Sequence, residues 1–179
     1  SNIEGHDNTA IGLDALYRND FGSYNTANGR NSLRNNISGE KNTAVGFSSL
    51  LSNSTGSNNT ASGSFALYEN ETGYSNTALG HSALYQNTSG HNNTATGDSS
   101  LYHNSVGDFN TSNGHVALYN NISGGNNTAN GAFALLTNTI GNFNTANGYA
   151  ALLDNTGSSN TASGSYSLSS NENGNFNTA

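Results

Sequence analysis

The 179-residue chain contains no cysteine, proline, methionine or tryptophan, and only 8% of its residues are charged. Without cysteine there is no disulfide, no thiolate metal site and no cysteine nucleophile. Four Lys and Arg residues stand against 11 Asp and Glu, so the net charge is -7. Binding of a phosphate backbone needs several basic residues on one face, and nucleic acid is therefore not an expected partner. No apolar run approaches the roughly 18 residues of a membrane-spanning helix, and none is predicted.

Hydrophobic residues are also scarce, at 32% of the chain against about 45–50% in an average globular domain. One large mixed core is therefore excluded. Intrinsic disorder is not favoured either, because disordered chains combine low hydrophobicity with high charge and few aromatic residues. This chain has 9 Tyr and 7 Phe, and they recur at fixed places. The composition indicates an ordered but thin structure of single-domain length.

The chain is built from an internal repeat. Asn-Thr-Ala, once Asn-Thr-Ser, starts at Asn8, Asn25, Asn42, Asn59, Asn76, Asn93, Asn110, Asn127, Asn144, Asn160 and Asn177. Every interval is 17 residues except the one from Asn144 to Asn160, which is 16. Numbered from this asparagine, the unit reads N-T-A-x-G-x-x-[AS]-L-x-x-N-x-x-G-x-x. The residue missing from the short copy falls between Asn155 and Gly157, where we expect a loop.

A unit of 17 residues is too short for a helical repeat, which needs about 33 residues or more. Regular Asn, Ser and Gly residues predict short strands separated by turns. We expect one strand over positions one to four, a turn at Gly five, a second strand over positions six to eleven, and a loop from Asn twelve through Gly fifteen. Coils stacked about 4.8 Å apart would form a rod roughly 50 Å long. The sequence thus predicts that residues 1–179 form a single all-β domain, a parallel β-solenoid (β-roll) of about ten coils.

The invariant columns of this solenoid have expected roles. Stacked asparagines at positions one and twelve should form hydrogen-bonded amide ladders. The glycines at positions five and fifteen suit turns with positive φ or close approaches of backbone. The chain starts and stops within a repeat, and solenoid ends normally carry caps. We therefore expect an uncapped fragment of a longer protein, or a subunit whose ends stack on others in a filament.

Position ten carries a second apolar column beside the leucines of position nine. Because side chains alternate along a strand, positions nine and ten should point to opposite faces, and a thin roll can bury only one of them. Arg34 and Ser169 are the exceptions in this column. Each buried large side chain would stabilise association by about 1.5–3 kcal/mol before the costs of association. The predicted oligomer interface is Tyr17, Leu51, Tyr68, Tyr85, Tyr102, Tyr119, Leu136 and Leu153.

The run N-T-A-I-G-L-D-A-L from Asn8 to Leu16 resembles the A-x-G-x-x-A coil of trimeric autotransporter adhesin heads. The unit looks like that coil with residues added around Asn-x-x-Gly. Similar N-T-A-x-G-x-x-A-L arrays occur in phage-tail-fibre-like and bacterial surface proteins. The resemblance spans Asn8 to Ala179 and implies left-handed coils assembled as a parallel homotrimer. The motif residues of the family are structural, so the resemblance assigns no functional residue.

Catalysis needs unlike residues that converge in a pocket, whereas a repeat offers the same surroundings again and again. We therefore expect no enzyme, no catalytic residue and no cofactor. His81 and His115 share position six two coils apart, and His6 and His91 share position sixteen five coils apart, so no metal site is predicted. The carboxylates are scattered over variable positions and fit a solvated rim. No calcium-binding nonapeptide or phosphate-binding glycine loop is present.

Three repetitive features remain as candidates for binding. The threonines of position two are as regular as those of ice-binding solenoids, but Ile11, Val45 and Leu79 interrupt the neighbouring column. The tyrosines of position ten could stack sugars. Sequons for N-glycosylation also recur at position twelve, although turn chemistry alone produces such triplets. Their asparagines are Asn36, Asn53, Asn70, Asn87 and Asn121.

Together these features predict a non-enzymatic structural segment of an extracellular fibre or adhesin, at a cell surface or on a virion. It would form a homo-oligomer, a trimer above all, or a filament. It would project a binding tip or present a repetitive surface to a host or to a glycan. The alternative is an ice-binding or glycan-binding β-solenoid that acts through the Thr or Tyr column.

Overall fold

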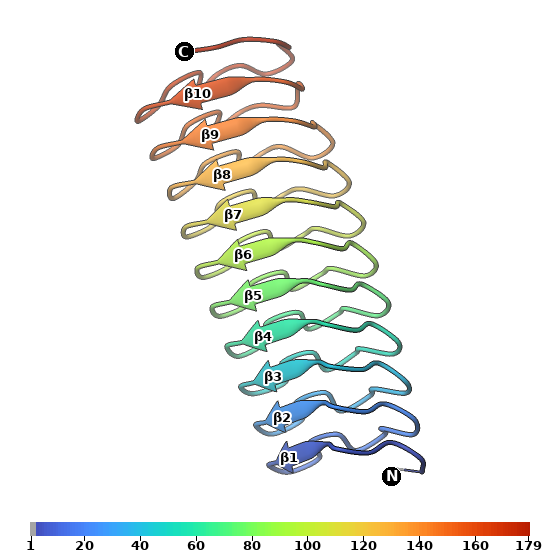
Figure 1. Ribbon diagram of the computed structural model, residues 1–179. Coiled ribbons are helices and arrows are strands. Elements are labelled where there is room, and N and C mark those ends of the chain that lie inside the picture. Colours follow the sequence, from blue (N-terminus) through green and yellow to red (C-terminus); the bar gives the residue numbers. More distant parts are fainter. Residues whose placement is uncertain (1–2) are drawn as a thin grey trace.

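The computed structural model describes residues 3–179, and these form a parallel β-solenoid. Each coil contributes one short strand, and the strands stack in chain order into a single sheet with the two termini at opposite ends of the rod (Figure 1). The strands are β1 Thr9–Ile11, β2 Thr26–Asn28, β3 Thr43–Val45, β4 Thr60–Ser62, β5 Thr77–Leu79, β6 Thr94–Thr96, β7 Thr111–Asn113, β8 Thr128–Asn130, β9 Thr145–Asn147 and β10 Thr161–Ser163. The predicted all-β solenoid of 17-residue coils is confirmed.

The strand occupies positions two to four of the repeat, within the range that the sequence predicts. Every strand pairs in register with the next, threonine beside threonine, as in Thr26 with Thr43. The middle residue points inward and is fully buried from Ala27 onward, whereas the flanking threonine and position-four residue face outward. This alternation is that of a sheet with one covered face. Because the covered side chain is alanine, the coil is thin.

The second predicted strand, over positions six to eleven, is wrong. A series of tight turns runs there, in which Ala15 N–H donates to the Gly12 carbonyl and Tyr17 N–H to the Asp14 carbonyl, both at 3.3 Å. Positions seven and nine, the third residues of these turns, have positive φ in every coil. A positive φ at the third residue is the mark of a type II turn. The chain therefore bends repeatedly where an extended segment was expected.

The leucines of position nine all adopt this left-handed conformation, with φ between 47 and 54°. Such a conformation costs an L-residue about 1–2 kcal/mol. It turns the leucine into the interior, where from Leu33 to Leu152 the side chain is fully buried, and burial of a leucine gives back about 1.5–3 kcal/mol. The backbone stays paired between coils, since Leu33 N–H donates to the Ser49 carbonyl at 3.0 Å. Position nine is thus inside and position ten outside, as predicted, but a turn rather than a strand separates them.

The interior of the rod combines apolar and amide columns. Alanine at position three, alanine or serine at position eight and leucine at position nine meet two columns of buried asparagine at positions one and twelve. The one serine in the alanine column, Ser112, is satisfied inside the core. Its hydroxyl lies 2.7 Å from the Ser100 hydroxyl and donates to the Ala117 carbonyl at 2.9 Å. The exceptional serine is thereby matched by a serine in the neighbouring coil.

Two asparagines in every coil hold the same carbonyl oxygen. In the second coil, Asn25 Nδ2 donates to the Gly39 carbonyl at 2.8 Å and Asn36 Nδ2 donates to it at 2.9 Å. The same pair of bonds recurs in all ten coils. We call it the asparagine clamp of the position-fifteen glycine. The clamp closes the loop of each coil onto its strand.

The same asparagines link each coil to the next. Asn42 N–H donates to Asn25 Oδ1 at 2.9 Å, and Asn53 Nδ2 donates to Asn36 Oδ1 at 2.7 Å. Stacked identical amides of this kind satisfy one another along the whole rod. The predicted amide ladders are confirmed.

Glycine is required at positions five and fifteen for different reasons. Gly five has φ between 124 and 144° and lies against the glycine of the next coil, so both its conformation and its space exclude a side chain. Gly fifteen has no such φ. A Cβ at Gly107 would collide with Asn104 Oδ1, Asn121 Nδ2 and the Gly124 carbonyl. Close approach alone therefore requires glycine at position fifteen.

The one-residue deletion in the ninth coil interrupts the position-twelve ladder. Asn155 still donates to the Gly157 carbonyl at 3.0 Å, and its Oδ1 accepts from Asn160 Nδ2 and Asn171 Nδ2, both at 3.0 Å. Asn138 Oδ1 receives no bond, and among residues 3–179 it is the buried side-chain polar atom left without a partner. The loop tolerates the deletion, as predicted, at the expense of one amide contact.

Replacement of a clamped glycine should destabilise the rod. Gly107→Ala forces apart the ladder amides and the neighbouring carbonyl, and we expect the free energy of unfolding to fall by about 3 kcal/mol or more. Gly125→Ala is the matched control, because Gly125 occupies position sixteen, where other coils carry side chains. Its added Cβ would meet one close atom, the Asp108 carbonyl oxygen at 3.1 Å, and should cost less than about 1 kcal/mol. Chemical denaturation measures both. Equal losses would contradict the clamp.

Insertion of one serine between Asn155 and Thr156 should stabilise the protein. The ninth coil then regains its full length, and Asn138 Oδ1 gains a donor, which is worth about 1–3 kcal/mol for a buried group. The same serine inserted between Asn138 and Thr139 lengthens a regular coil and should destabilise it. Thermal unfolding of the two variants compares them, and a loss of stability in the first would show that the unpaired oxygen is not a defect.

Candidate functional site

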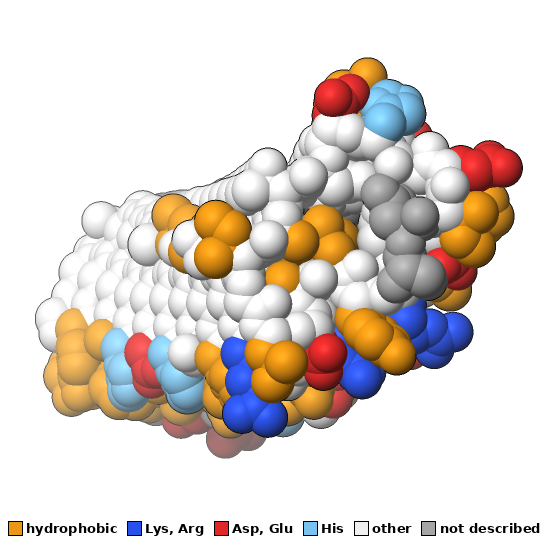
Figure 2. All heavy atoms as spheres, turned by 90° about the horizontal axis from the view of Figure 1, so that it is seen from below, with side chains coloured by type: hydrophobic (Ala, Val, Ile, Leu, Met, Phe, Trp, Pro, Cys, Tyr) orange, Lys and Arg blue, Asp and Glu red, His pale blue; other side chains and the backbone are white. Residues whose placement is uncertain are grey.

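The outward columns carry the variable side chains, and they are unevenly distributed. Hydrophobic, histidine and charged side chains gather along one edge and at one end of the rod, while the broad surface between them shows mainly other side chains and backbone (Figure 2). Functional chemistry must lie in these columns, because the inward columns are occupied by the core and the asparagine ladders.

The side chains of the position-ten column, predicted as an oligomer interface, partly cover one another. Tyr17 is 53% exposed, whereas the other candidates, Leu51, Tyr68, Tyr85, Tyr102, Tyr119, Leu136 and Leu153, are half-buried. Four successive tyrosine rings stack face to face, with centroids 4.9–5.1 Å apart and planes within 20° of one another. Each ring therefore covers the face of its neighbour. The interface itself stays a prediction.

This stacking bears on sugar binding through the tyrosines. A sugar packs on the face of an aromatic ring, and the facing sides of Tyr68, Tyr85, Tyr102 and Tyr119 are already in contact. The inner rings offer only their edges. Burial, followed by the neighbouring phenols and Glu69, raises the pKa of Tyr85, and burial with Tyr119 and Glu69 raises that of Tyr102. Both phenols thus stay protonated and lie near the Glu69 carboxylate.

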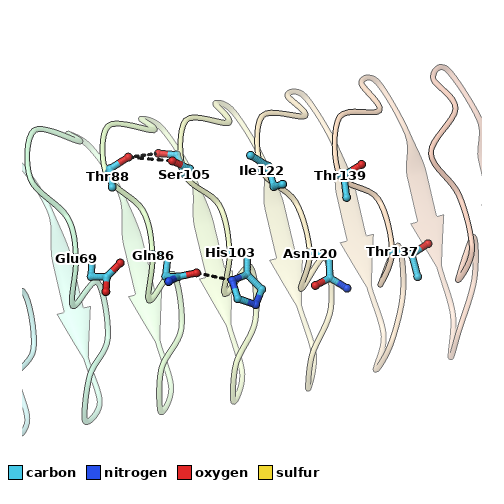
Figure 3. A pocket seen from close by; sticks show the side chains of 9 residues that line it. All are labelled: Glu69, Gln86, Thr88, His103, Ser105, Asn120, Ile122, Thr137 and Thr139. Atoms are coloured by element: carbon cyan, nitrogen blue, oxygen red, sulfur yellow. Dashed lines mark hydrogen bonds between the residues drawn. The ribbon is translucent and has the colours of Figure 1, made fainter.

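A groove of about 660 Å³ runs along the rod beside the tyrosine stack. One wall is formed by position eleven and the other by position thirteen, and each of the fifth to eighth coils supplies a facing pair (Figure 3). The asparagine of position twelve, between the two walls in sequence, is buried. The groove spans the fourth to the eighth coil. Its lining is Glu69, Gln86, Thr88, His103, Ser105, Asn120, Ile122, Thr137 and Thr139.

Some groove side chains bond to one another and others do not. His103 Nδ1 contacts Gln86 Oε1, and Thr88 Oγ1 donates to the Ser105 carbonyl at 2.9 Å (Figure 3). Within residues 3–179, the side chains of Glu69, Asn120 and Thr139 make no hydrogen bond. The groove therefore presents polar groups that are available to a ligand.

His81, His91 and His115 pair with carboxylates of neighbouring coils. Asp98, at position six between His81 and His115, lies 2.9 Å from His81 Nδ1 and 3.6 Å from His115 Nε2. His91 contacts Asp108 in the same way at position sixteen. Sequence reasoning paired the histidines by position but overlooked the aspartate that stands between the first two. Residues 3–179 contain no group of three His, Cys, Asp or Glu side chains arranged to hold a metal ion.

The five sequon asparagines occupy the position-twelve ladder. Asn36, Asn53, Asn70, Asn87 and Asn121 are fully buried, and the Nδ2 of each donates to a neighbouring Asn Oδ1 and to a glycine carbonyl. A glycan is attached through this same nitrogen. The folded coil leaves no space for one, so modification at these positions is incompatible with the ladder.

The threonine column lies on the outer face of the sheet, together with position four. Ile11, Val45 and Leu79 stand exposed in that second column, and Thr96 is its one threonine. The face is flat and regular, but it lacks a continuous pair of threonine columns.

Comparison of the chain with protein-family models, with curated proteins and with solved structures finds no match. In the part of the chain that the structure describes, no helix has the length and hydrophobicity needed to cross a bilayer.

The groove histidine should make stability depend on pH. Burial lowers the pKa of His103, so the folded state prefers the neutral ring. Its stabilising contribution is complete above the ordinary pKa of about 6.5 and is lost as the pH falls through the lowered value. Wild type should therefore lose more stability than His103→Gln when the pH drops from about 7.5 to about 5. Unfolding curves of both proteins at each pH test this. If the difference in stability between wild type and His103→Gln did not vary with pH, the prediction would be contradicted.

Proposed function

We propose that this segment is a non-enzymatic structural rod of an extracellular fibre or adhesin. It holds a binding region away from a cell or virion surface, or presents a repetitive surface of its own. The observation that carries the proposal is that the inward positions of each coil are fixed, whereas the outward ones vary, apart from the threonine of position two. The ladders, the clamp and the leucine column recur from coil to coil, while positions four, six, eleven and thirteen vary and position ten is mostly Tyr or Leu.

This division suits a spacer because length and surface are independent. Each coil bonds to its neighbours through the same asparagine and backbone contacts, so one more coil extends the rod without a new kind of contact. The core and the asparagine ladders do not use the outward side chains. These side chains are free to meet a partner, a host surface or another chain.

Assembly as a homotrimer is part of the proposal. Large apolar side chains remain exposed in several outward columns, among them Tyr17, Phe47 and Phe109, which are 53, 41 and 54% exposed. Contiguous apolar surface on a thin rod favours association, and the position-ten column with its neighbours at positions six and seven is the most continuous aromatic surface. A parallel trimer would cover this surface in all three chains.

The ice-binding alternative has the regular threonine face in its favour, but exposed Ile11, Val45 and Leu79 break its second column. For the glycan-binding alternative, the sequence predicts the tyrosine column as the site, but we favour the groove beside it. The groove beside the tyrosine stack, rather than the ring faces, offers free polar groups.

Removal of two complete coils should shorten the rod and leave the rest intact. Deletion of residues 25–58 joins Tyr24 to Asn59 in register, and we expect small-angle scattering to give a rod shorter by about 10 Å. Light scattering on the same samples should give three times 18.4 kDa for the full chain. Loss of the folded rod on deletion would contradict modular stacking. A stable monomer would contradict the trimer.

A further inference from the structure

We propose that the groove between positions eleven and thirteen, from the fourth to the eighth coil, binds a neutral, unbranched oligosaccharide that lies along the rod axis. This inference deepens the proposed function, since it names the ligand class that a surface-presenting rod would meet, and it rests on that function for its biological setting. The site uses no residue of the core or of the asparagine clamp.

The shape of the groove favours a linear ligand. Its volume of about 660 Å³ lies within the range of about 300–1,000 Å³ that is common for small-molecule sites, but it is stretched over five coils. The fourth coil adds Glu69 alone, and each of the fifth to eighth coils adds one side chain to each wall, as Gln86 and Thr88 do in the fifth (Figure 3). A chain of similar units, running parallel to the stack of coils, matches this arrangement.

The lining favours an uncharged ligand. One wall offers the amides of Gln86 and Asn120 and the hydroxyl of Thr137, and the other offers hydroxyls on either side of Ile122. No Lys or Arg lines the groove. Glu69 is its one carboxylate, and burial lowers the pKa of His103, which keeps the ring neutral. Sulfated or uronic-acid chains would therefore find no cationic partner here, and the net charge of -7 would repel them.

The backbone of the groove cannot bind a peptide as an added strand. Such binding needs free main-chain N–H and carbonyl groups. The N–H groups of Gln86, His103 and Asn120 already donate to the next coil, at 2.9, 3.0 and 3.2 Å. Recognition must come from side chains, which suits a ligand that brings its own hydroxyl groups.

The unbonded polar groups are placed to receive those hydroxyls. Glu69 and Asn120 stand on one wall and Thr139 on the other, all half-buried and without a side-chain hydrogen bond among the described residues (Figure 3). Gln86 contacts His103 through Oε1, which leaves its amide donors for a ligand. Half-buried donors and acceptors that lack a protein partner gain most from a ligand that satisfies them.

Two pairs of variants test the site. Asn120→Leu removes an amide from one wall, and Ser105→Tyr fills the groove from the other. Their matched controls, Asn35→Leu and Ser54→Tyr, place the same changes at positions eleven and thirteen of coils outside the groove. Titration calorimetry of the full chain measures the affinity for three neutral hexasaccharides, namely cellohexaose, maltohexaose and the hexamer of N-acetylglucosamine.

We expect at least one series to bind at millimolar concentration or tighter, with affinity about tenfold weaker in each groove variant and unchanged in the controls. Failure of all three series to bind, equal affinities in groove and control variants, or preferential binding of a sulfated glycan or a peptide would overturn the proposal. Scattering of the same samples reports the rod, so an intact rod without sugar binding refutes this inference alone. A collapsed wild-type chain would refute the proposed function.

Discussion

The carbonyl oxygen of the position-fifteen glycine, held by two asparagine amides, is the interaction on which the rest of the structure depends. A coil whose interior is alanine and leucine has too little apolar surface to define its loop by packing alone. The two amides close the loop, as Asn25 and Asn36 do at Gly39, and their oxygens connect each coil to the next. In a narrow interior of low dielectric constant, these bonds are strong when complete and costly when one is missing, as at Asn138.

The clamp, the leucine column and the two columns of small residues at positions three and eight fill the interior. The contacts that hold the coils together therefore do not depend on the outward side chains. Tyrosines can stack with one another, histidines can meet carboxylates of adjacent coils, and a polar groove can form over a few coils without any change in the backbone. The same backbone thus carries different chemistry at different heights along the rod. A spacer and a binding surface are compatible in one chain for this reason.

Most of the architecture could be predicted from the sequence, because the repeat places identical residues in register and identical residues stack. The coil length, the parallel sheet, the amide ladders and the loop that absorbs the deletion follow from that. The turns over positions six to eleven do not, since a left-handed leucine contradicts local propensity and is held by burial and contacts between coils. The groove could not be foreseen either, because it depends on which side chains occupy positions eleven and thirteen of five successive coils.

The most direct test of this account is the hydrogen exchange of the asparagine side-chain amides, followed by NMR. The clamp predicts that Nδ2 protons of positions one and twelve, such as those of Asn76 and Asn87, exchange as slowly as backbone amides of the sheet. The exposed Asn58 and Asn92 should exchange at the rate of free amides. Fast exchange at Asn76 and Asn87 in a folded rod would show that the ladders do not hold the coils together.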